Sequence, residues 1–104
     1  MPWYFYLAYF FAGAFAVNAV PHFVSGVCGR PFPTPFAKPP GKGLSSPVVN
    51  VLWAAFNASL AFALLRYVGE FHFRLLPDAL AFATGALLLA VMTAKIFGTR
   101  LAGK

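Results

Sequence analysis

Charged residues are scarce in this chain. Lysine, arginine, aspartate and glutamate make up 10% of its 104 residues, and only two residues are acidic. A soluble domain carries about 25% charged residues, because water must solvate most of its surface. Hydrophobic residues, in contrast, make up 61% of the chain, which argues against a soluble protein. The net charge of +6 therefore does not point to nucleic acid, and anionic membrane lipid is the expected partner.

Residues that form catalytic or metal centres are also few. The single cysteine, Cys28, excludes an intrachain disulfide and cannot form a metal cluster alone. His22 is the only side chain within the first two apolar blocks whose unperturbed pKa lies near neutral pH, and Glu70 and Asp78 are expected at the opposite membrane surface. His72 is expected there too, which argues against a haem held by both histidines. We therefore expect no catalytic residue, no metal site and no cofactor; an enzyme would depend on His22 or Cys28.

Long uncharged blocks dominate the sequence. No charged residue occurs in residues 1–29, 43–65 or 79–94. A membrane-spanning helix needs about 20 mainly apolar residues, and the third block reaches that length if Lys95 extends to the interface. The N-terminus lacks the basic start and small-residue cleavage site of a signal peptide, so we expect its helix to be retained. The sequence predicts an all-α integral membrane protein with one domain, residues 1–104, and three transmembrane helices in an antiparallel bundle, at about 3–27, 47–68 and 78–97.

The segments between the helices contain start and stop signals. Residues 28–46 are rich in proline, which predicts a semi-rigid extended loop. Phe32 and Phe36 favour a loop lying against the membrane surface, and the alternative is a proline-rich ligand for an aromatic groove. Ser46 and Pro47 are typical of a helix start, and Gly69 is placed to end the second helix. Pro77 and Asp78 should open the third helix, and Gly98 should follow its end.

Orientation follows from the basic residues that flank the spans. The first loop and the C-terminal tail share one side and hold six lysines and arginines, against two on the other side, Arg66 and Arg74. Because basic residues are enriched on the cytoplasmic side, we expect the N-terminus outside and the C-terminus inside. Contacts with lipid headgroups are then predicted for Arg30, Lys38, Lys42, Lys95 and Arg100.

Polar side chains recur within the first two spans. Asn18 and His22 share one face of the first helix, because residues four apart are neighbours on a helix surface. Asn50 and Asn57 share one face of the second helix, with Trp53 at its edge. Counting the rise along antiparallel helices pairs Asn18 with Asn57 and His22 with Asn50. This ladder is either a set of contacts that fix helix packing or a ligand or proton site, and the sequence leaves both open.

Small residues recur every four positions on all three helices, a spacing that lets helix backbones approach closely. The third helix has more such rows than one bundle needs, which suggests contacts with other transmembrane helices. The rows comprise Ala8, Ala12 and Ala16; Ala55, Ser59 and Ala63; and Ala86, Ala90 and Ala94.

Three segments resemble a group of small uncharacterised bacterial inner-membrane proteins of three or four helices. They are residues 18–23 (NAVPHF), 31–36 (PFPTPF) and 45–53 (SSPVVNVLW), within about the first 60 residues. The resemblance implies a bacterial inner membrane and no established activity, so it assigns no functional residue.

Two functions follow as expectations. The first is a small non-enzymatic membrane protein that acts as an oligomer or as an accessory subunit of a larger membrane complex. The alternative is a binder or transporter of a small or lipid-like molecule that uses the polar cluster Asn18, His22, Asn50, Trp53 and Asn57.

Overall fold

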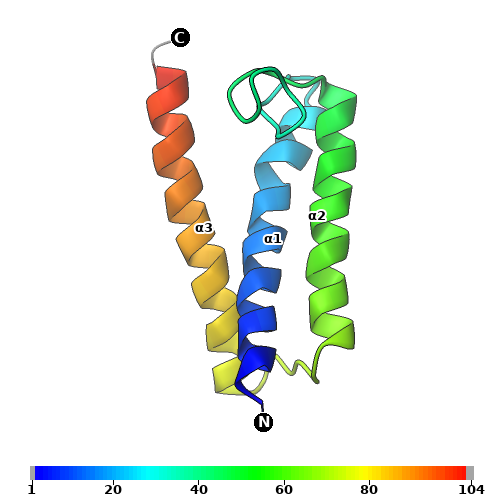
Figure 1. Ribbon diagram of the computed structural model, residues 1–104, viewed down its shortest axis with the longest axis vertical. Helices are drawn as coiled ribbons and strands as arrows, with labels where there is room; N and C mark the ends of the chain where they lie inside the picture. The colour runs from blue at the N-terminus through cyan, green and yellow to red at the C-terminus, as the bar shows by residue number, and fades with distance from the viewer. Residues whose placement is uncertain (1, 103–104) are drawn as a thin grey trace.

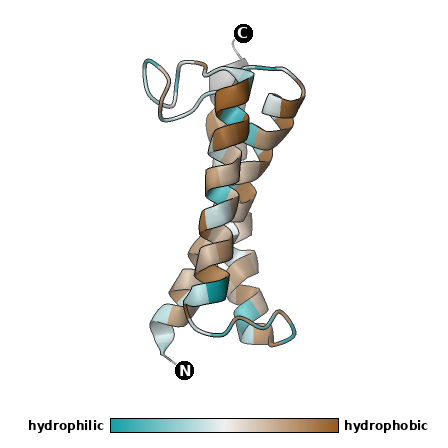
Figure 2. Cartoon of the chain, turned by 90° about the vertical axis from the view of Figure 1, so that its right-hand side faces the viewer, coloured by the Kyte–Doolittle hydropathy of each residue, from teal (hydrophilic) through white to brown (hydrophobic). Residues whose placement is uncertain are grey.

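Three long α-helices make up most of the chain (Figure 1). The computed structural model describes residues 2–102, and side chains through residue 99. Helix α1 covers Trp3–Val27, α2 covers Pro47–Tyr67 and α3 covers Leu76–Ala102. Each helix is long and apolar enough to cross a membrane. Their lengths are mostly brown to white in Figure 2, interrupted by a few teal bands, and teal also marks the loops and helix ends. The predicted all-α fold with three apolar spans is confirmed.

The helices form a layer with α1 in the middle. Helix α1 packs against both α2 and α3, whereas α2 and α3 do not contact each other within the described residues (Figure 1). Consecutive helices run in opposite directions, so α3 lies parallel to α1. The molecule is 46 Å long, which matches a bilayer of about 40–45 Å including its headgroup regions. We call the end with residues 28–46 the loop end and the other the N-terminal end.

Glycines set the contacts of α1 with its neighbours. A Cβ atom at Gly13 would overlap the Phe82 carbonyl oxygen, and one at Gly85 would overlap the Phe10 carbonyl oxygen. A Cβ at Gly26 would meet a Val51 methyl group at 2.5 Å. Such close backbone approach is how transmembrane helices gain packing contacts without a hydrophobic driving force. The glycines therefore seat α3 against the N-terminal half of α1, and α2 at the loop end.

Helix α2 begins and ends at the predicted signals. The Ser46 hydroxyl accepts a hydrogen bond from the Val49 backbone N–H at 3.2 Å, and Pro47 occupies the first turn. Gly69 follows the helix with a φ of 69°, a left-handed conformation that favours glycine. The helix ends one residue before the predicted Val68, which is its C-cap.

Helix α3 is longer than predicted at both ends. It begins at Leu76 rather than residue 78, because proline is tolerated in the first turn, where its missing N–H has no helical acceptor. The Asp78 carboxylate accepts a hydrogen bond from the His72 backbone N–H at 3.0 Å and so ties the preceding loop to the helix. The predicted end before Gly98 is wrong. Gly98 lacks the positive φ of a glycine helix stop, and the helix continues to Ala102.

The proline-rich loop folds back on itself instead of extending. Phe32 and Ser45 form an antiparallel bridge with N–H to O distances of 3.3 and 3.0 Å. Between them the Thr34 carbonyl accepts hydrogen bonds from the backbone N–H groups of Ala37 and Gly41. Proline lacks a donor, so the few N–H groups of this segment converge on a few carbonyls. The prediction of an extended loop is therefore wrong.

Candidate functional site

The first rung of the polar ladder joins Asn18 to Asn57 across α1 and α2. The Asn57 Nδ2 donates to the Trp53 carbonyl oxygen at 2.8 Å, one turn earlier in α2. That contact leaves Asn57 Oδ1 as the acceptor for Asn18 Nδ2, at 3.0 Å. Asn57 is fully buried, and both polar atoms of its amide are satisfied. The predicted pair is confirmed.

The second rung joins His22 to Asn50 near the loop end. The Asn50 Nδ2 faces three backbone carbonyl oxygens, those of Phe32, Ser45 and Ser46, at 3.0–3.2 Å. Of the two polar atoms of the Asn50 amide, only the nitrogen can donate to these carbonyls. The Asn50 Oδ1 therefore faces the His22 Nδ1, at 2.7 Å. The neutral ring is therefore protonated on Nδ1 and carries its lone pair on Nε2. This predicted pair is also confirmed, and it additionally fixes the histidine tautomer.

Aromatic rings surround the second rung. The Phe32 ring meets His22 edge-on at a centroid distance of 5.4 Å and contacts Phe97 of α3 at 4.9 Å. Trp53 packs edge-on against His22 at 6.4 Å and against Phe36 at 5.1 Å. Phe32 therefore packs inward onto the ladder, and the expectation that it lies against the membrane surface is wrong. Phe36 stays 64% exposed and is free to contact lipid.

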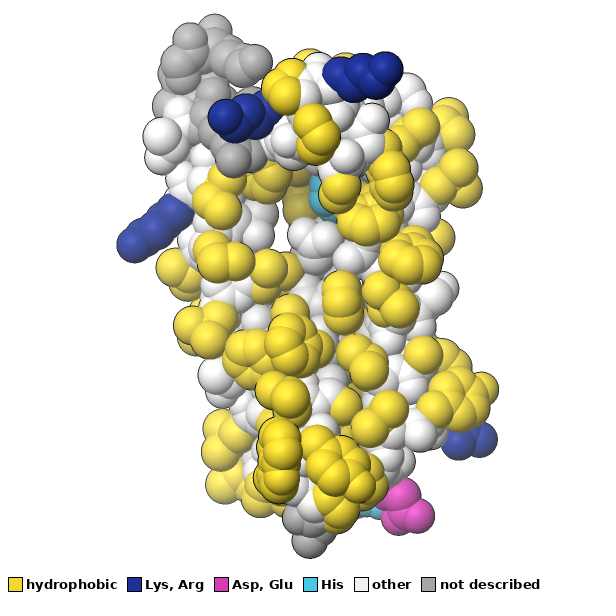
Figure 3. All heavy atoms as spheres, in the orientation of Figure 1, with side chains coloured by type: hydrophobic (Ala, Val, Ile, Leu, Met, Phe, Trp, Pro, Cys, Tyr) yellow, Lys and Arg dark blue, Asp and Glu magenta, His cyan; other side chains and the backbone are white. Residues whose placement is uncertain are grey.

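A cavity lies beside the ladder, between α1, the loop and α3. Its volume is about 270 Å³, and Asn18, His22 and Trp53 contribute to its wall. The loop closes it with residues 33–35 and 41, and α3 contributes one face between residues 89 and 97. Figure 3 shows the surface hollowed in this region, below the loop and beside α3. The structure thus brings three of the five predicted cluster residues to one cavity, and Asn50 and Asn57 lie behind them in the helix contact.

The basic residues predicted to contact lipid headgroups are solvent-facing where their side chains are described. Arg30, Lys38 and Lys42 are exposed on the first loop, and Lys95 is exposed on α3. The side chain of Arg100 lies outside the described residues. At the N-terminal end, His72 and Glu70 are 3.9 Å apart and largely exposed. Among the described residues, no group of three His, Cys, Asp or Glu side chains could hold a metal ion.

Sequence reasoning missed the contributions of the loop and of α3. The Phe32 and Ser45 carbonyls orient Asn50, and Thr93 and Phe97 close the cavity from α3. Gly13 and Gly26, which set the helix contacts, were not singled out either. A lone glycine within a predicted span is the signal that marks such positions, because glycine otherwise weakens a helix.

The fold and this cluster define a polytopic α-helical membrane protein with three apolar spans and a polar contact inside them. Comparison of the chain with models of known families, with curated proteins and with solved structures gives no match.

Proposed function

We propose that the protein is a small non-enzymatic membrane protein that acts as an oligomer or as an accessory subunit of a larger membrane complex. The observation that carries the proposal is an open groove along the contact of α1 and α2. We call it the docking groove, and its volume is about 400 Å³. It is lined by Ala19, Val20, Phe23 and Val24 of α1 and by Val51, Ala54, Ala55 and Ala58 of α2.

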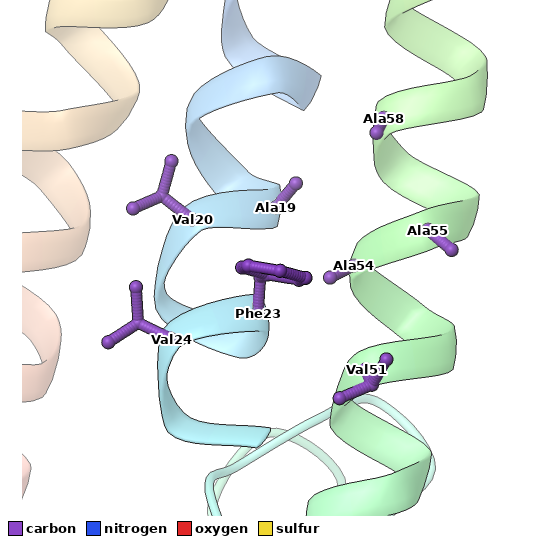
Figure 4. Close-up of a pocket in the computed structure, with 8 residues that line it drawn as sticks. All are labelled: Ala19, Val20, Phe23, Val24, Val51, Ala54, Ala55 and Ala58. Carbon is purple, nitrogen blue, oxygen red and sulfur yellow. The ribbon is translucent and has the colours of Figure 1, made fainter. Parts of the chain in front are cut away.

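The docking groove has the character of a helix-packing surface. In Figure 4, Ala19 and Phe23 of α1 point toward α2, and Ala54 points back toward α1. The α2 wall is built mostly of alanines, and Ala55 continues into an exposed row with Ser59. The Ser59 hydroxyl donates to the Ala55 carbonyl oxygen of its own helix at 2.8 Å, so the row presents no unsatisfied donor to an apolar neighbour. Small residues and satisfied polar groups are the features that let a second transmembrane helix approach closely.

Helix α3 supports the same proposal. In the most apolar 18-residue stretch of α3, 6% of the residues are buried, against 22% in the corresponding stretches of α1 and α2. Its small row is open at Ala90 and Ala94, which are exposed and do not contact α2. Helix α3 is thus held by one neighbour and has most of its surface available for lipid or for another chain.

The proposed setting is a bacterial inner membrane with the loop end in the cytoplasm. The greater number of basic residues at the loop end supports this orientation, since basic residues are retained on the cytoplasmic side. Arg30, Lys38, Lys42 and Lys95 would then meet anionic headgroups.

The proposal is tested by filling the docking groove. Ala55→Leu adds bulk where a neighbouring helix would pack, so it should reduce the cross-linked or co-purified assembly by about tenfold, equivalent to about 1.4 kcal/mol. Ala55→Ser is the matched control, because serine keeps the position small, as Ser59 does in the same exposed row. Chemical cross-linking in membranes, followed by mass measurement after mild solubilisation, gives the readout. A wild-type protein that is monomeric and free of partner proteins would contradict the proposal.

A further inference from the structure

Two polar atoms of the ladder have no hydrogen-bond partner within the described residues. Asn18 uses its Nδ2 to reach Asn57, which leaves its Oδ1, and His22 uses its Nδ1 to reach Asn50, which leaves its Nε2. Neither atom is sealed in the protein, because neither is among the fully buried polar atoms that lack a partner. Both residues line the cavity beneath the loop. His22 is only 4% exposed, so its Nε2 is reached through that cavity.

Both atoms are hydrogen-bond acceptors. The orientation of each is fixed indirectly, through its partner. The Trp53 carbonyl orients Asn57, which bonds Asn18. The Phe32, Ser45 and Ser46 carbonyls orient Asn50, which bonds His22. Neither the Asn18 amide nor the His22 ring can therefore flip without breaking a rung. A molecule that pairs with these two acceptors must supply the donor, and an aprotic carbonyl or ether would leave both unpaired.

The cavity wall excludes a charged occupant. None of its described lining residues is Lys, Arg, Asp or Glu, and a charge placed there would be buried without a partner. The α3 wall is apolar at Leu89, Met92 and Ile96. Thr93 also lines this wall, and it lines an apolar groove between α1 and α3 as well. A polar head at the ladder and an apolar body along α3 fit this distribution.

We infer that the cavity beneath the loop binds a neutral amphiphile with a hydroxyl head, a phenol or an alcohol on an apolar chain, which donates its hydrogen bond to His22 Nε2 or Asn18 Oδ1. The volume of about 270 Å³ lies just below the range of about 300–1,000 Å³ for sites of drug-sized ligands. The cavity therefore holds the head and the first carbons, and the chain runs out along the seam between α1 and α3. This site is separate from the docking groove and does not rest on the proposed assembly.

The test uses protein with ¹⁵N-labelled histidine in lipid nanodiscs, titrated with para-octylphenol. Without the probe, the His22 ring should show a protonated Nδ1 and an unprotonated Nε2. The phenol should move the Nε2 resonance upfield in a saturable manner, because a pyridine-type nitrogen shifts in this direction when it accepts a hydrogen bond. His72, exposed in the other loop, is the internal reference and should not move. The comparison probe is para-octylanisole, which has the same apolar body but no donor.

Two variants of α3 localise the site. Leu89→Trp adds bulk from the cavity wall without touching the ladder, and it should weaken phenol binding by at least about tenfold. Leu87→Trp is the matched control, because Leu87 is 66% exposed and does not line the cavity. If Leu89→Trp fails to fold, Thr93→Leu fills the same cavity from the next turn.

The inference is overturned by any of four results. The first is a His22 ring protonated on Nε2. The second is the absence of a saturable Nε2 shift with the phenol, as when only water occupies the cavity, and the third is an equal shift with the anisole. The fourth is equal phenol binding by the Leu89→Trp and Leu87→Trp variants.

Discussion

Asn50 and Asn57 have both polar side-chain atoms hydrogen-bonded within the protein, whereas Asn18 and His22 use one atom each and present the other to a cavity. Helix contact and the proposed ligand binding are thus divided among these four residues. Asn50 makes more structural contacts, since its amide hydrogen-bonds three carbonyls of the loop and the start of α2 as well as His22. Asn57 makes one contact between helices and one within α2.

This difference predicts that replacing Asn50 and replacing Asn57 lower the free energy of unfolding by different amounts. Asn57→Leu should lower the free energy of unfolding by about 0.5–2 kcal/mol, because hydrogen bonds between helices in membranes average about 0.6 kcal/mol and Asn18 would lose its acceptor. Asn50→Leu should cost more, since three carbonyls keep only their backbone hydrogen bonds and His22 loses its partner. Unfolding in mixed detergent measures both values, with Ser59→Ala as a neutral control because its hydroxyl bonds only its own helix. Equal costs for the two asparagines would contradict this assignment.

The two rungs could be predicted from the sequence because helix rise places level positions of antiparallel helices side by side. The histidine tautomer and the cavity could not. They depend on the carbonyl directions of Phe32 and Ser45, in a loop without periodicity, and on which face of α3 meets α1. A pattern of apolar residues does not specify that face when the whole helix is apolar.

At the scale of the elements, glycine has opposite roles at two positions of α3. Gly85 lies against the backbone of Phe10, where even a methyl group would overlap. Gly98 has open space around its Cβ position and continues the helix. The prediction that Gly98 follows the helix end failed because glycine ends a helix by adopting a positive φ, and Gly98 does not adopt one.

These two glycines form a matched pair for a stability measurement. Gly85→Ala should displace α3 from α1 and lower the free energy of unfolding by about 1–3 kcal/mol, the usual cost of overpacking. Gly98→Ala should be neutral or stabilising by up to about 1 kcal/mol, since alanine favours a helix over glycine. A Gly85→Ala variant as stable as the wild type would show that α3 is not seated where the structure places it.

At the scale of the whole molecule, the three helices form a layer rather than a closed triangle. Helix α1 is covered on two sides, α2 and α3 on one each, and the loop joins all three at one end. Phe32 connects the three helices. Its backbone carbonyl accepts a hydrogen bond from Asn50 of α2, and its ring contacts His22 of α1 and Phe97 of α3. A layer of this kind exposes more apolar surface than a bundle, which suits contacts with lipid or with a further chain.

The central claim is that the chain crosses a membrane three times, and cysteine accessibility tests it most directly. Single cysteines are placed by Lys38→Cys, His72→Cys and Thr99→Cys in a Cys28→Ser background, since Cys28 is exposed. A membrane-impermeant maleimide applied to intact cells and to inverted vesicles then reports the side of each position. Three spans with the proposed orientation predict labelling of position 72 from outside only, and of positions 38 and 99 from the cytoplasmic side only. Labelling of positions 38 and 72 from the same side would contradict the account, because α2 would then not cross the membrane.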